Sequence, residues 1–231
     1  APNVEMMIDK GAELVIVSPF QNRGYGPVEK LGIPIIEGAD YMESLPLGRT
    51  EWIRFYGMLF GKEALADSIF RQTEKSYLDL KQLVTADMPR PTVISEKKFG
   101  ASWFMPAGDS YIANMYADAG ADYVFKELPG AGSTPLAFET VLDRAIHADM
   151  WLIKYNQSGD MTYGDLRAEY APYENFDAFK NRRIYSCNTG LVPYYEEFPL
   201  HPDYLLKDLI WVFHPELLPG YSPRYYRKMQ D

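Results

Sequence analysis

Short apolar runs rich in β-branched residues recur along this chain, and segments with helical spacing separate them. The run Glu13–Ser18 follows a helical pattern over Val4–Lys10, and Ile33–Ile36 follows a short helical segment that ends at Gly32. Short apolar runs of this kind indicate strands that are buried on both faces, which is typical of parallel sheets. Helix, strand, helix and strand within residues 1–36 therefore predict a parallel α/β unit.

A longer helical pattern occupies the middle of the chain. Thr50 is placed to cap a helix containing Trp52 and Tyr56, and Gly57 weakens that helix. A second helix is predicted from residue 62 towards residue 85, where residues 89–91 end it with two prolines. Its apolar residues form one stripe at helical spacing: Leu65, Ile69, Phe70, Tyr77, Leu80 and Val84.

A second α/β series follows these helices. The patterns predict strands at 92–95, 123–125, 150–153 and 183–187, helices at 110–119, 138–145, 176–179 and 203–213, and a loop at 102–106. The predicted fold class is α/β, with two Rossmann-like lobes that have parallel sheets and are joined by one long helix. The expected boundaries are 1–46 for the first lobe, 47–90 for the connecting helices and 91–231 for the second lobe.

The charge balance argues against a nucleic-acid partner. The 231 residues include 32 acidic and 23 basic side chains, a formal net charge of −9, with no basic cluster. Nucleic-acid binding depends on lysine and arginine at the phosphates. The single cysteine, Cys187, excludes an internal disulfide and a cysteine-based zinc site. Because no apolar run reaches about 18 residues, no membrane-spanning segment is predicted.

Motifs that would indicate catalysis or a cofactor are incomplete. Gly24-Tyr25-Gly26 follows a strand, but Glu29 stands where a dinucleotide-binding loop has its third glycine. Gly108-Asp109-Ser110 lacks the second glycine of a nucleophile elbow, and either of its last two residues is expected to cap the next helix. The three histidines lack metal-binding spacing, and the adjacent Glu196 and Glu197 would point to opposite faces. We therefore expect no catalytic residue, no metal and no cofactor. The alternative is an α/β enzyme that uses a nucleotide or nicotinamide cofactor.

Aromatic and amide side chains occur just after several of the predicted strands. Ligands of open parallel sheets bind outside the carboxyl ends of the strands, so these loops are the expected walls of a ligand cleft. For Trp103, packing in the core is the alternative. The candidate ligand-binding residues are Phe20, Asn22, Tyr25, Trp103, Phe104, Tyr155, Asn156, Asn188, Tyr194 and Tyr195.

Several short sequence segments, in the same order along nearly the whole chain, resemble segments of one protein family. These are the helical-backbone periplasmic binding proteins, which capture iron-siderophores, haem or cobalamin for bacterial ABC importers. Arg182 stands where that family usually has a glycine. The matching stretches are Asn3–Ile16, Leu31–Ile35, Phe60–Ala64, Pro129–Leu142, Asn181–Tyr185 and His201–Glu216.

The resemblance implies a protein without enzymatic activity that binds a bulky metal chelate or a corrinoid-like ligand and delivers it to an ABC permease in the membrane. It also implies a location in the periplasm, or on a lipid anchor facing it, with the signal segment outside this chain. Glu139 matches the acidic residue of the second lobe that pairs with permease arginines in the family. The first-lobe counterpart would lie near Phe20–Asn22, where this chain has no acid.

Members of the family usually carry further strands of the first lobe before the position of Asn3. The resemblance therefore implies that residues 1–46 form an incomplete first lobe. A strand without its neighbour exposes an edge that can pair with another chain. Self-association through this edge and weak ligand binding are the expected consequences.

Overall fold

The computed structural model describes residues 3–19 and 24–231, which divide into two compact units, Ala1–Glu43 and Ser44–Asp231. The candidate residues Phe20 and Asn22 lie outside the described residues. Each unit contains a parallel sheet, which confirms the predicted α/β class. The two central helices belong to the second unit, because they pack on its helices.

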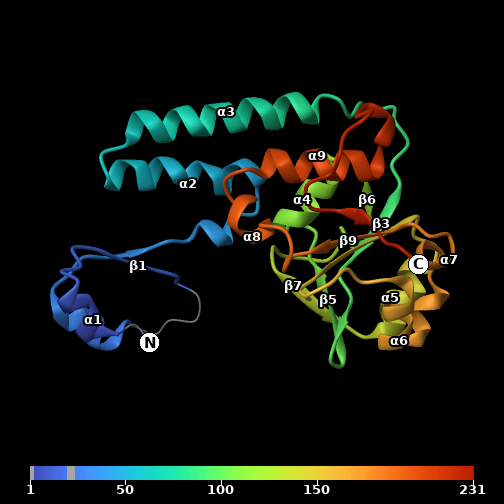
Figure 1. Ribbon diagram of the computed structural model, residues 1–231, viewed down its shortest axis with the longest axis horizontal. Helices are drawn as coiled ribbons and strands as arrows, with labels where there is room; N and C mark the ends of the chain where they lie inside the picture. Colours follow the sequence, from blue (N-terminus) through green and yellow to red (C-terminus); the bar gives the residue numbers. More distant parts are fainter. Residues whose placement is uncertain (1–2, 20–23) are drawn as a thin grey trace. The chain divides into compact units, whose positions relative to one another are not determined.

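The first unit is a small parallel α/β element. Its helix α1 (Val4–Asp9) is capped by Asn3, whose side chain accepts a hydrogen bond of 3.1 Å from the backbone nitrogen of Met6. Strands β1 (Val15–Val17) and β2 (Ile35–Glu37) pair in parallel, as predicted (Figure 1). Two 3₁₀ helices complete the unit: η1 (Gly26–Leu31), which ends at the left-handed Gly32, and η2 (Asp40–Met42).

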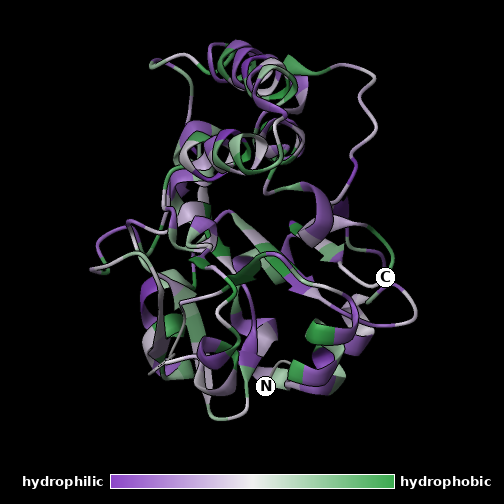
Figure 2. Cartoon of the chain, turned by 90° about the vertical axis from the view of Figure 1, so that its left-hand side faces the viewer, coloured by the Kyte–Doolittle hydropathy of each residue, from purple (hydrophilic) through white to green (hydrophobic). Residues whose placement is uncertain are grey.

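Two helices, α2 (Pro46–Leu59) and α3 (Glu63–Lys81), form an antiparallel hairpin at the start of the second unit (Figure 1). Figure 2 looks almost along both helix axes and shows apolar residues between polar stretches on each helix. The apolar residue Tyr77 on α3 is buried, and its hydroxyl donates a hydrogen bond of 2.6 Å to Asp118. The hairpin is thereby fixed to the remainder of the second unit.

Two details of α2 differ from the sequence prediction. The helix begins at Pro46, because proline is well suited to the first helical position. Thr50 is therefore not its cap; it is fully buried within the helix, and its hydroxyl donates to the carbonyls of Pro46 and Pro199 at 3.3 and 3.1 Å. Gly57 continues the helix, and a Cβ there would lie 2.4 Å from Cβ of Ala66, so glycine permits the close contact between α2 and α3.

The main sheet of the second unit has five strands in the order β10-β9-β8-β3-β6. All neighbouring strands are parallel except β10, which pairs antiparallel with β9. This confirms the predicted strands near residues 92, 150 and 184. The strands are β3 (Thr92–Ser95), β6 (Asp122–Tyr123), β8 (Met150–Tyr155), β9 (Ile184–Asn188) and β10 (Arg227–Lys228).

A second, three-stranded sheet contains the segment that the sequence predicted as a loop. That segment is strand β5 (Ser102–Pro106), which pairs antiparallel with β4 (Lys98–Phe99) and β7 (Ser133–Leu136). The prediction of a loop was wrong because Trp103 and Met105 alternate with the exposed Phe104, and this period of two indicates a strand. Strands β4 and β5 form a hairpin that extends beyond the main sheet (Figure 1).

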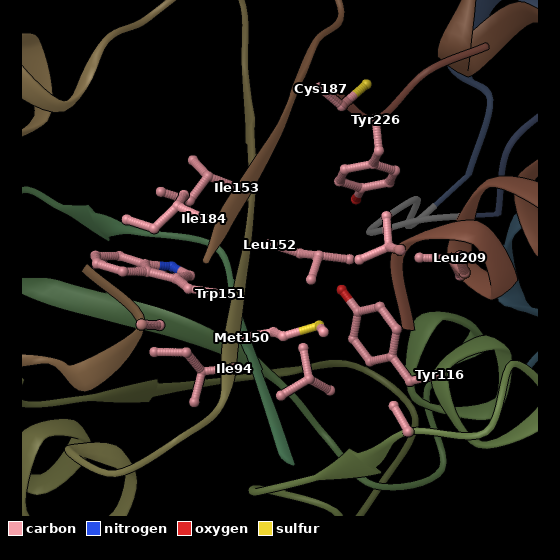
Figure 3. Packing of buried hydrophobic residues seen from close by; sticks show 14 of the residues in the cluster. Ile94, Tyr116, Met150, Trp151, Leu152, Ile153, Ile184, Cys187, Leu209 and Tyr226 are labelled. Carbon is pink, nitrogen blue, oxygen red and sulfur yellow. The ribbon is translucent and has the colours of Figure 1, made fainter. Parts of the chain in front are cut away.

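The core lies on both faces of the main sheet. Successive side chains of a strand point to opposite faces, and Figure 3 shows Met150 and Leu152 on the side of Tyr116, Leu209 and Tyr226. Trp151 lies on the opposite face, where it packs against Trp103, Tyr173 and Phe176 at ring-centre distances of 5.1 to 5.4 Å. The four residues Met150–Ile153 are all buried, as expected of a parallel strand covered on both faces.

The helices around the sheet begin at well-defined caps. Ser110 caps α4 by accepting a hydrogen bond from the nitrogen of Ala113 at 3.3 Å, as predicted. Thr162 and Asp165 form a reciprocal capping box at the start of α6. The remaining elements are α4 (Tyr111–Asp118), α5 (Phe138–Ala145), α6 (Tyr163–Glu169), η3 (Ala171–Asn175), α7 (Asp177–Lys180), α8 (Tyr194–Glu197), α9 (Pro202–Phe213) and η4 (Pro215–Leu217).

Candidate ligand-binding site

Two adjoining cavities open at the carboxyl ends of β3 and β8 in the second unit. The first, here called the lysine cavity, has a volume of about 450 Å³ and is lined by Glu96, Lys97, Lys98, Phe99, Phe104, Pro106, Ser133, Lys154, Tyr155, Asn156 and Gln157. The second, the tyrosine cavity, has a volume of about 270 Å³ and includes Arg49, Tyr111, Tyr194, Tyr195 and Phe198. Both are lined by Glu96, Pro106, Ser133 and Lys154, so they meet at these four residues.

The end of β3 is held by two buried indoles. Trp103 donates a hydrogen bond of 3.0 Å from its ring nitrogen to the carbonyl of Ser95, and Trp151 donates one of 2.6 Å to the carbonyl of Glu96. The nitrogen of Glu96 donates to the carbonyl of Leu152 at 2.8 Å. Glu96 has a φ of 64°, a left-handed conformation that is unfavourable for a residue with a side chain. These bonds fix the backbone that leads into the lysine cavity.

An ion pair joins the two strands at the point where the cavities meet. The Lys154 ammonium donates to the Glu96 carboxylate, and the two side chains are 15% and 24% exposed. Burial is the strongest single influence on Lys154 and opposes its charged form, but the charge and hydrogen bond of Glu96, together with Tyr194 and Tyr116, raise the pKa of Lys154 well above its usual value. Lys154 therefore stays cationic beneath the cavities at neutral pH.

Two further lysines stand on the rim of the lysine cavity. Lys97 forms an ion pair with Glu169, whose two oxygens lie 2.5 and 2.7 Å from its ammonium. Lys98 donates to the carbonyl of Gly100 at 2.5 Å and lies 5.0 Å from the ring centre of Tyr170. Among the described residues no carboxylate lies within ion-pair distance of Lys98. Because Lys98 lines the cavity, its ammonium is accessible to a bound ligand.

The tyrosine cavity is bounded by stacked aromatic rings. The Arg49 guanidinium lies 4.9 Å from the ring centre of Phe198 and 5.9 Å from that of Tyr111. The Tyr111 hydroxyl is buried without a hydrogen-bond partner among the described residues. Tyr194 is nearly buried, whereas Tyr195 is 58% exposed and offers a ring face to solvent. This wall provides flat apolar contact area with few polar groups.

The two cavities differ in charge from the remainder of the protein. Their described lining residues include four basic side chains, Arg49, Lys97, Lys98 and Lys154, and one carboxylate, Glu96. The whole chain has a formal net charge of −9. A basic, aromatic-lined surface on an acidic protein favours a ligand with negative charge and flat apolar parts.

Five of the predicted ligand-binding residues line these cavities. Phe104, Tyr155 and Asn156 line the lysine cavity, and Tyr194 and Tyr195 line the tyrosine cavity. Loops that are distant in sequence thus meet because the parallel strands β3 and β8 end at the same edge of the sheet.

Three other predicted residues have different positions. Trp103 was predicted to contact ligand, and this was wrong: it is 0% exposed and packs in the aromatic core, where its indole supports the end of β3. Asn188 is also buried, and it accepts hydrogen bonds from the nitrogens of Gln157 and Gly190 while donating to the carbonyl of Gly159. It positions the loop after β8 instead of facing either cavity. Tyr25 belongs to the first unit, where its hydroxyl donates to Glu37.

The sequence reasoning missed the charged residues of the site. Glu96, Lys97 and Lys98 are consecutive in the sequence, and neither this short run nor Lys154 matches a motif. One signal was present for Lys154, because it is a charged residue within an otherwise apolar strand run. Charged residues are rarely buried unless they are paired, so Lys154 indicated a buried partner.

Residues 3–19 and 24–231 contain no group of three or more histidine, cysteine, aspartate or glutamate side chains placed to hold a metal ion. Cys187 is buried, and burial raises the pKa of its thiol to about 12, so the unreactive thiol form dominates at neutral pH. Within the same described residues, no helix has the length and hydropathy to cross a bilayer.

Glu139 stands in the first turn of α5 and is exposed. Its neighbour Phe138 is buried, which fixes the helix to the core and leaves the carboxylate at the surface. Among the described residues, no cation forms an ion pair with Glu139. The side chain is therefore available to a partner.

Comparison with protein families identifies the chain. Residues 2–189 match the profile of one family, described as periplasmic binding protein. The chain belongs to the periplasmic binding protein family. Two relatives are uncharacterized lipoproteins of Methanocaldococcus jannaschii, which are 29% and 26% identical over 98% and 99% of this chain. The chain spans 54% and 59% of their lengths, a little more than half.

Solved structures of other periplasmic binding proteins have the same fold. A TroA-like periplasmic binding protein, FepB, of Veillonella parvula aligns with a TM-score of 0.70 at 17% identity, over 99% of this chain and 75% of that protein. A possible iron-binding protein of Staphylococcus epidermidis gives 0.70 at 17% identity, over 92% and 80%. An ABC-type Fe³⁺-hydroxamate transport protein of Saccharomonospora viridis gives 0.68 at 16% identity, over 91% and 71%. The family and these neighbours are described as binding proteins and not as enzymes, and the chain shares their family and fold.

Proposed function

We propose that this periplasmic binding protein captures a bulky iron chelate or a similar macrocyclic ligand at the joined lysine and tyrosine cavities and delivers it to an ABC permease. The observation that carries the proposal is the pair of adjoining cavities at the carboxyl ends of β3 and β8. Such strand ends are where parallel α/β folds bind ligands. Exposed aromatic side chains at Phe99, Phe104 and Tyr195 provide the flat contact area that a chelate or a macrocycle requires.

The ligand class is supported by the names of related structures and by the charge of the site. Solved proteins of this fold include one described as possibly iron-binding and one from an Fe³⁺-hydroxamate transport system. Iron-siderophores, haem and cobalamin are all large enough to use both cavities. Among these ligands, iron chelates are favoured, because two proteins of the same fold are described in connection with iron.

A thermal-shift screen tests the proposal. A ligand that binds only the folded protein raises its melting temperature, by an amount that grows with ligand concentration. We expect stabilisation by ferric chelates, haem or cobalamin, and none by NAD or nucleotides. Stabilisation by NAD or a nucleotide alone would contradict solute capture and would favour an α/β enzyme.

Glu139 is proposed to contact the permease. It is an exposed carboxylate with no ion pair among the described residues, and charged rim contacts chiefly affect association. Glu139→Ala should leave ligand affinity unchanged and weaken permease binding in a pull-down with the transporter reconstituted in nanodiscs, with Glu174→Ala as the control for one lost surface carboxylate. Added salt should weaken the wild-type contact, because exposed charges are screened over about 10 Å at 0.1 M. Loss of ligand binding in Glu139→Ala would instead assign Glu139 to the ligand site.

We further propose that the protein acts outside the cytoplasmic membrane, either free in the periplasm or held by a lipid anchor. Two relatives are described as lipoproteins. Fractionation of cells that express the full-length protein, with and without globomycin to block lipoprotein processing, tests this location. Recovery of the protein in the cytoplasm would contradict it.

A further inference from the structure

The ion pair between Glu96 and Lys154 has a position that packing alone does not explain. Both side chains line both cavities, and each retains some exposure, 24% for Glu96 and 15% for Lys154. A buried ion pair seldom stabilises a fold more than apolar residues of the same size would. The pair thus places a charged, partly accessible group where the two cavities meet.

Lys154 and Glu96 differ in how strongly the surrounding structure restrains them. Lys154 belongs to β8, in the middle of the sheet, and is paired in register with Cys187 of β9. Glu96 follows the last residue of β3 and has the unfavourable φ of 64°. Hydrogen bonds from Trp151 and to Leu152 fix its backbone, but its carboxylate has no hydrogen-bond or ion-pair partner besides Lys154 among the described residues. The carboxylate can therefore rotate away from the ammonium without disturbing a second bond.

We propose that Glu96 is a built-in competitor for Lys154: its carboxylate occupies the ammonium while the site is empty, and an anionic group of the ligand replaces it. The inference rests on the proposed solute capture and gives the site a ligand class. Lys154 requires an anionic partner at neutral pH, whether that partner is Glu96 or the ligand. Once the Glu96 carboxylate has turned away, Lys154 and Lys98 present their ammonium groups to the ligand, while Lys97 stays paired with Glu169.

The ligand class that follows is a chelate with net negative charge. A ferric tris-catecholate is anionic, because three catecholate dianions outweigh one ferric ion. A ferric tris-hydroxamate has no net charge, because three hydroxamate monoanions balance the ferric ion. Because the two complexes are similar in size and hold the same metal, a difference in their affinities reports the effect of ligand charge. The competitor role also predicts a selectivity: a neutral chelate cannot replace Glu96 and should bind more weakly.

The experiment is a calorimetric titration of the full chain with two probes, the ferric complex of a hexadentate tris-catecholate and that of a hexadentate tris-hydroxamate. Glu96→Gln retains the size of the side chain and removes its charge. This variant should bind the tris-catecholate about tenfold more tightly, the order expected when one close charge interaction changes, and the tris-hydroxamate with less than about twofold change. Lys154→Gln should weaken tris-catecholate binding by about tenfold or more on the same basis.

Two controls separate the site from general charge and from misfolding. Glu174→Gln removes the same charge from an exposed pair with Arg167 that lines neither cavity, and it should leave both affinities unchanged. If Lys154→Gln melts within the assay range, Lys154→Arg retains the cation and should preserve the preference for the anionic probe. Circular dichroism of each variant reports whether it is folded.

Each outcome decides the matter. If Glu96→Gln binds the tris-catecholate more tightly than the wild type does, and the tris-hydroxamate equally, the competitor role is supported. The competitor role would be overturned if Glu96→Gln left tris-catecholate affinity unchanged or weaker, or if Glu174→Gln raised that affinity equally. Either result would leave the proposed solute capture in place. Binding of neither probe by the wild-type chain would overturn the proposed capture of iron chelates, and the inference with it.

Discussion

The two units of this protein have the same sequence pattern and very different cores. Both contain short apolar strands that pair in parallel. In Ala1–Glu43, the buried hydrophobic side chains among the described residues are Val15 and Val28, and Ile8 and Met42 are each 62% exposed. In Ser44–Asp231, the strands lie in a five-stranded sheet, and residues such as Trp151 are completely buried. A β-branched run thus specifies a strand, whereas burial of that strand depends on how many neighbours cover it.

The energetic consequence is large. Burying one valine, leucine or isoleucine side chain contributes about 1.5–3 kcal/mol, while ordering the backbone of one residue costs about 1–2 kcal/mol. Two buried valines cannot offset the ordering of the first unit. The second unit has a continuous core on both faces of its sheet and meets the requirement for independent folding.

The largest expected effect comes from separating the two units. A fragment of residues 44–231 should unfold cooperatively on heating, because it retains the whole main sheet, the helical hairpin and α9. A fragment of residues 1–43 should show no cooperative transition, because it retains one small sheet. Circular dichroism melting curves of both fragments measure this. Cooperative melting of the 1–43 fragment would show that the units are equivalent after all.

The next effect concerns a buried carboxylate that anchors the C-terminal segment of the second unit. Asp208 is 0% exposed and accepts hydrogen bonds from the Tyr221 hydroxyl and from the backbone nitrogens of Arg224, Tyr225 and Tyr226. Asp208→Asn replaces one accepting oxygen by a donor, so at least one buried donor loses its partner. We expect a loss of about 2–4 kcal/mol in the free energy of unfolding, measured by urea titration.

The control for this substitution is Asp79→Asn. Asp79 forms an exposed ion pair with Lys75 one helical turn away, so its loss should cost less than about 0.5 kcal/mol. Equal losses for the two substitutions would show that the second unit does not depend on its buried anchors.

A smaller effect depends on pH. The Arg224 side chain, which donates to Glu197, holds the pKa of Glu197 below its usual value, although burial opposes this. Because the folded-state pKa is depressed, the contribution is present above the unfolded pKa of about 4.3 and is lost as pH falls through the folded value. Glu197→Gln should therefore lower the free energy of unfolding by roughly 1 kcal/mol at neutral pH and by much less at pH 3, measured by urea titration at both values.

Glu37→Gln is the matched variant in the first unit, where Glu37 accepts a hydrogen bond from Tyr25. It should leave the main unfolding transition unchanged at both pH values, because the transition reports the second unit. A shift as large as that of Glu197→Gln would show that the first unit unfolds together with the second.

The smallest effect on stability belongs to the open sheet of the first unit. Strands β1 and β2 pair with each other alone among the described residues, and Ile16 of β1 is 42% exposed. If this sheet mediates the predicted self-association, Ile16→Lys should lower the apparent mass in sedimentation velocity at high concentration, because a charge blunts an edge strand. The melting temperature should change little, as surface substitutions usually alter stability by within about 0.5 kcal/mol. A wild-type chain that stays monomeric at high concentration would refute the self-association.

The sequence by itself determined the order and type of most elements. Short apolar runs predicted β1, β3, β8 and β9, because such runs suit strands buried on both faces. Ser110 predicted the start of α4, because a hydroxyl before a helix satisfies an orphan backbone nitrogen. These effects are local: they act over a few residues, so a short segment of sequence is enough to recognise them. The resemblance to periplasmic binding proteins, which depended on short segments in the same order along the chain, was confirmed at the level of the family.

Only the tertiary structure decided which side chains face the ligand. Trp103 and Phe104 are adjacent aromatic residues, and the pairing of β5 with β7 buries the first and exposes the second. Glu96 and Lys154 are 58 positions apart, and they form an ion pair because β3 and β8 are neighbours in register. Arg182, at a position where the family usually has glycine, adopts a φ of 55° with its guanidinium 4.3 Å from the ring centre of Tyr163. Each of these outcomes depends on contacts between segments distant in the chain, and the free energy of such contacts belongs to the packed fold rather than to any local pattern.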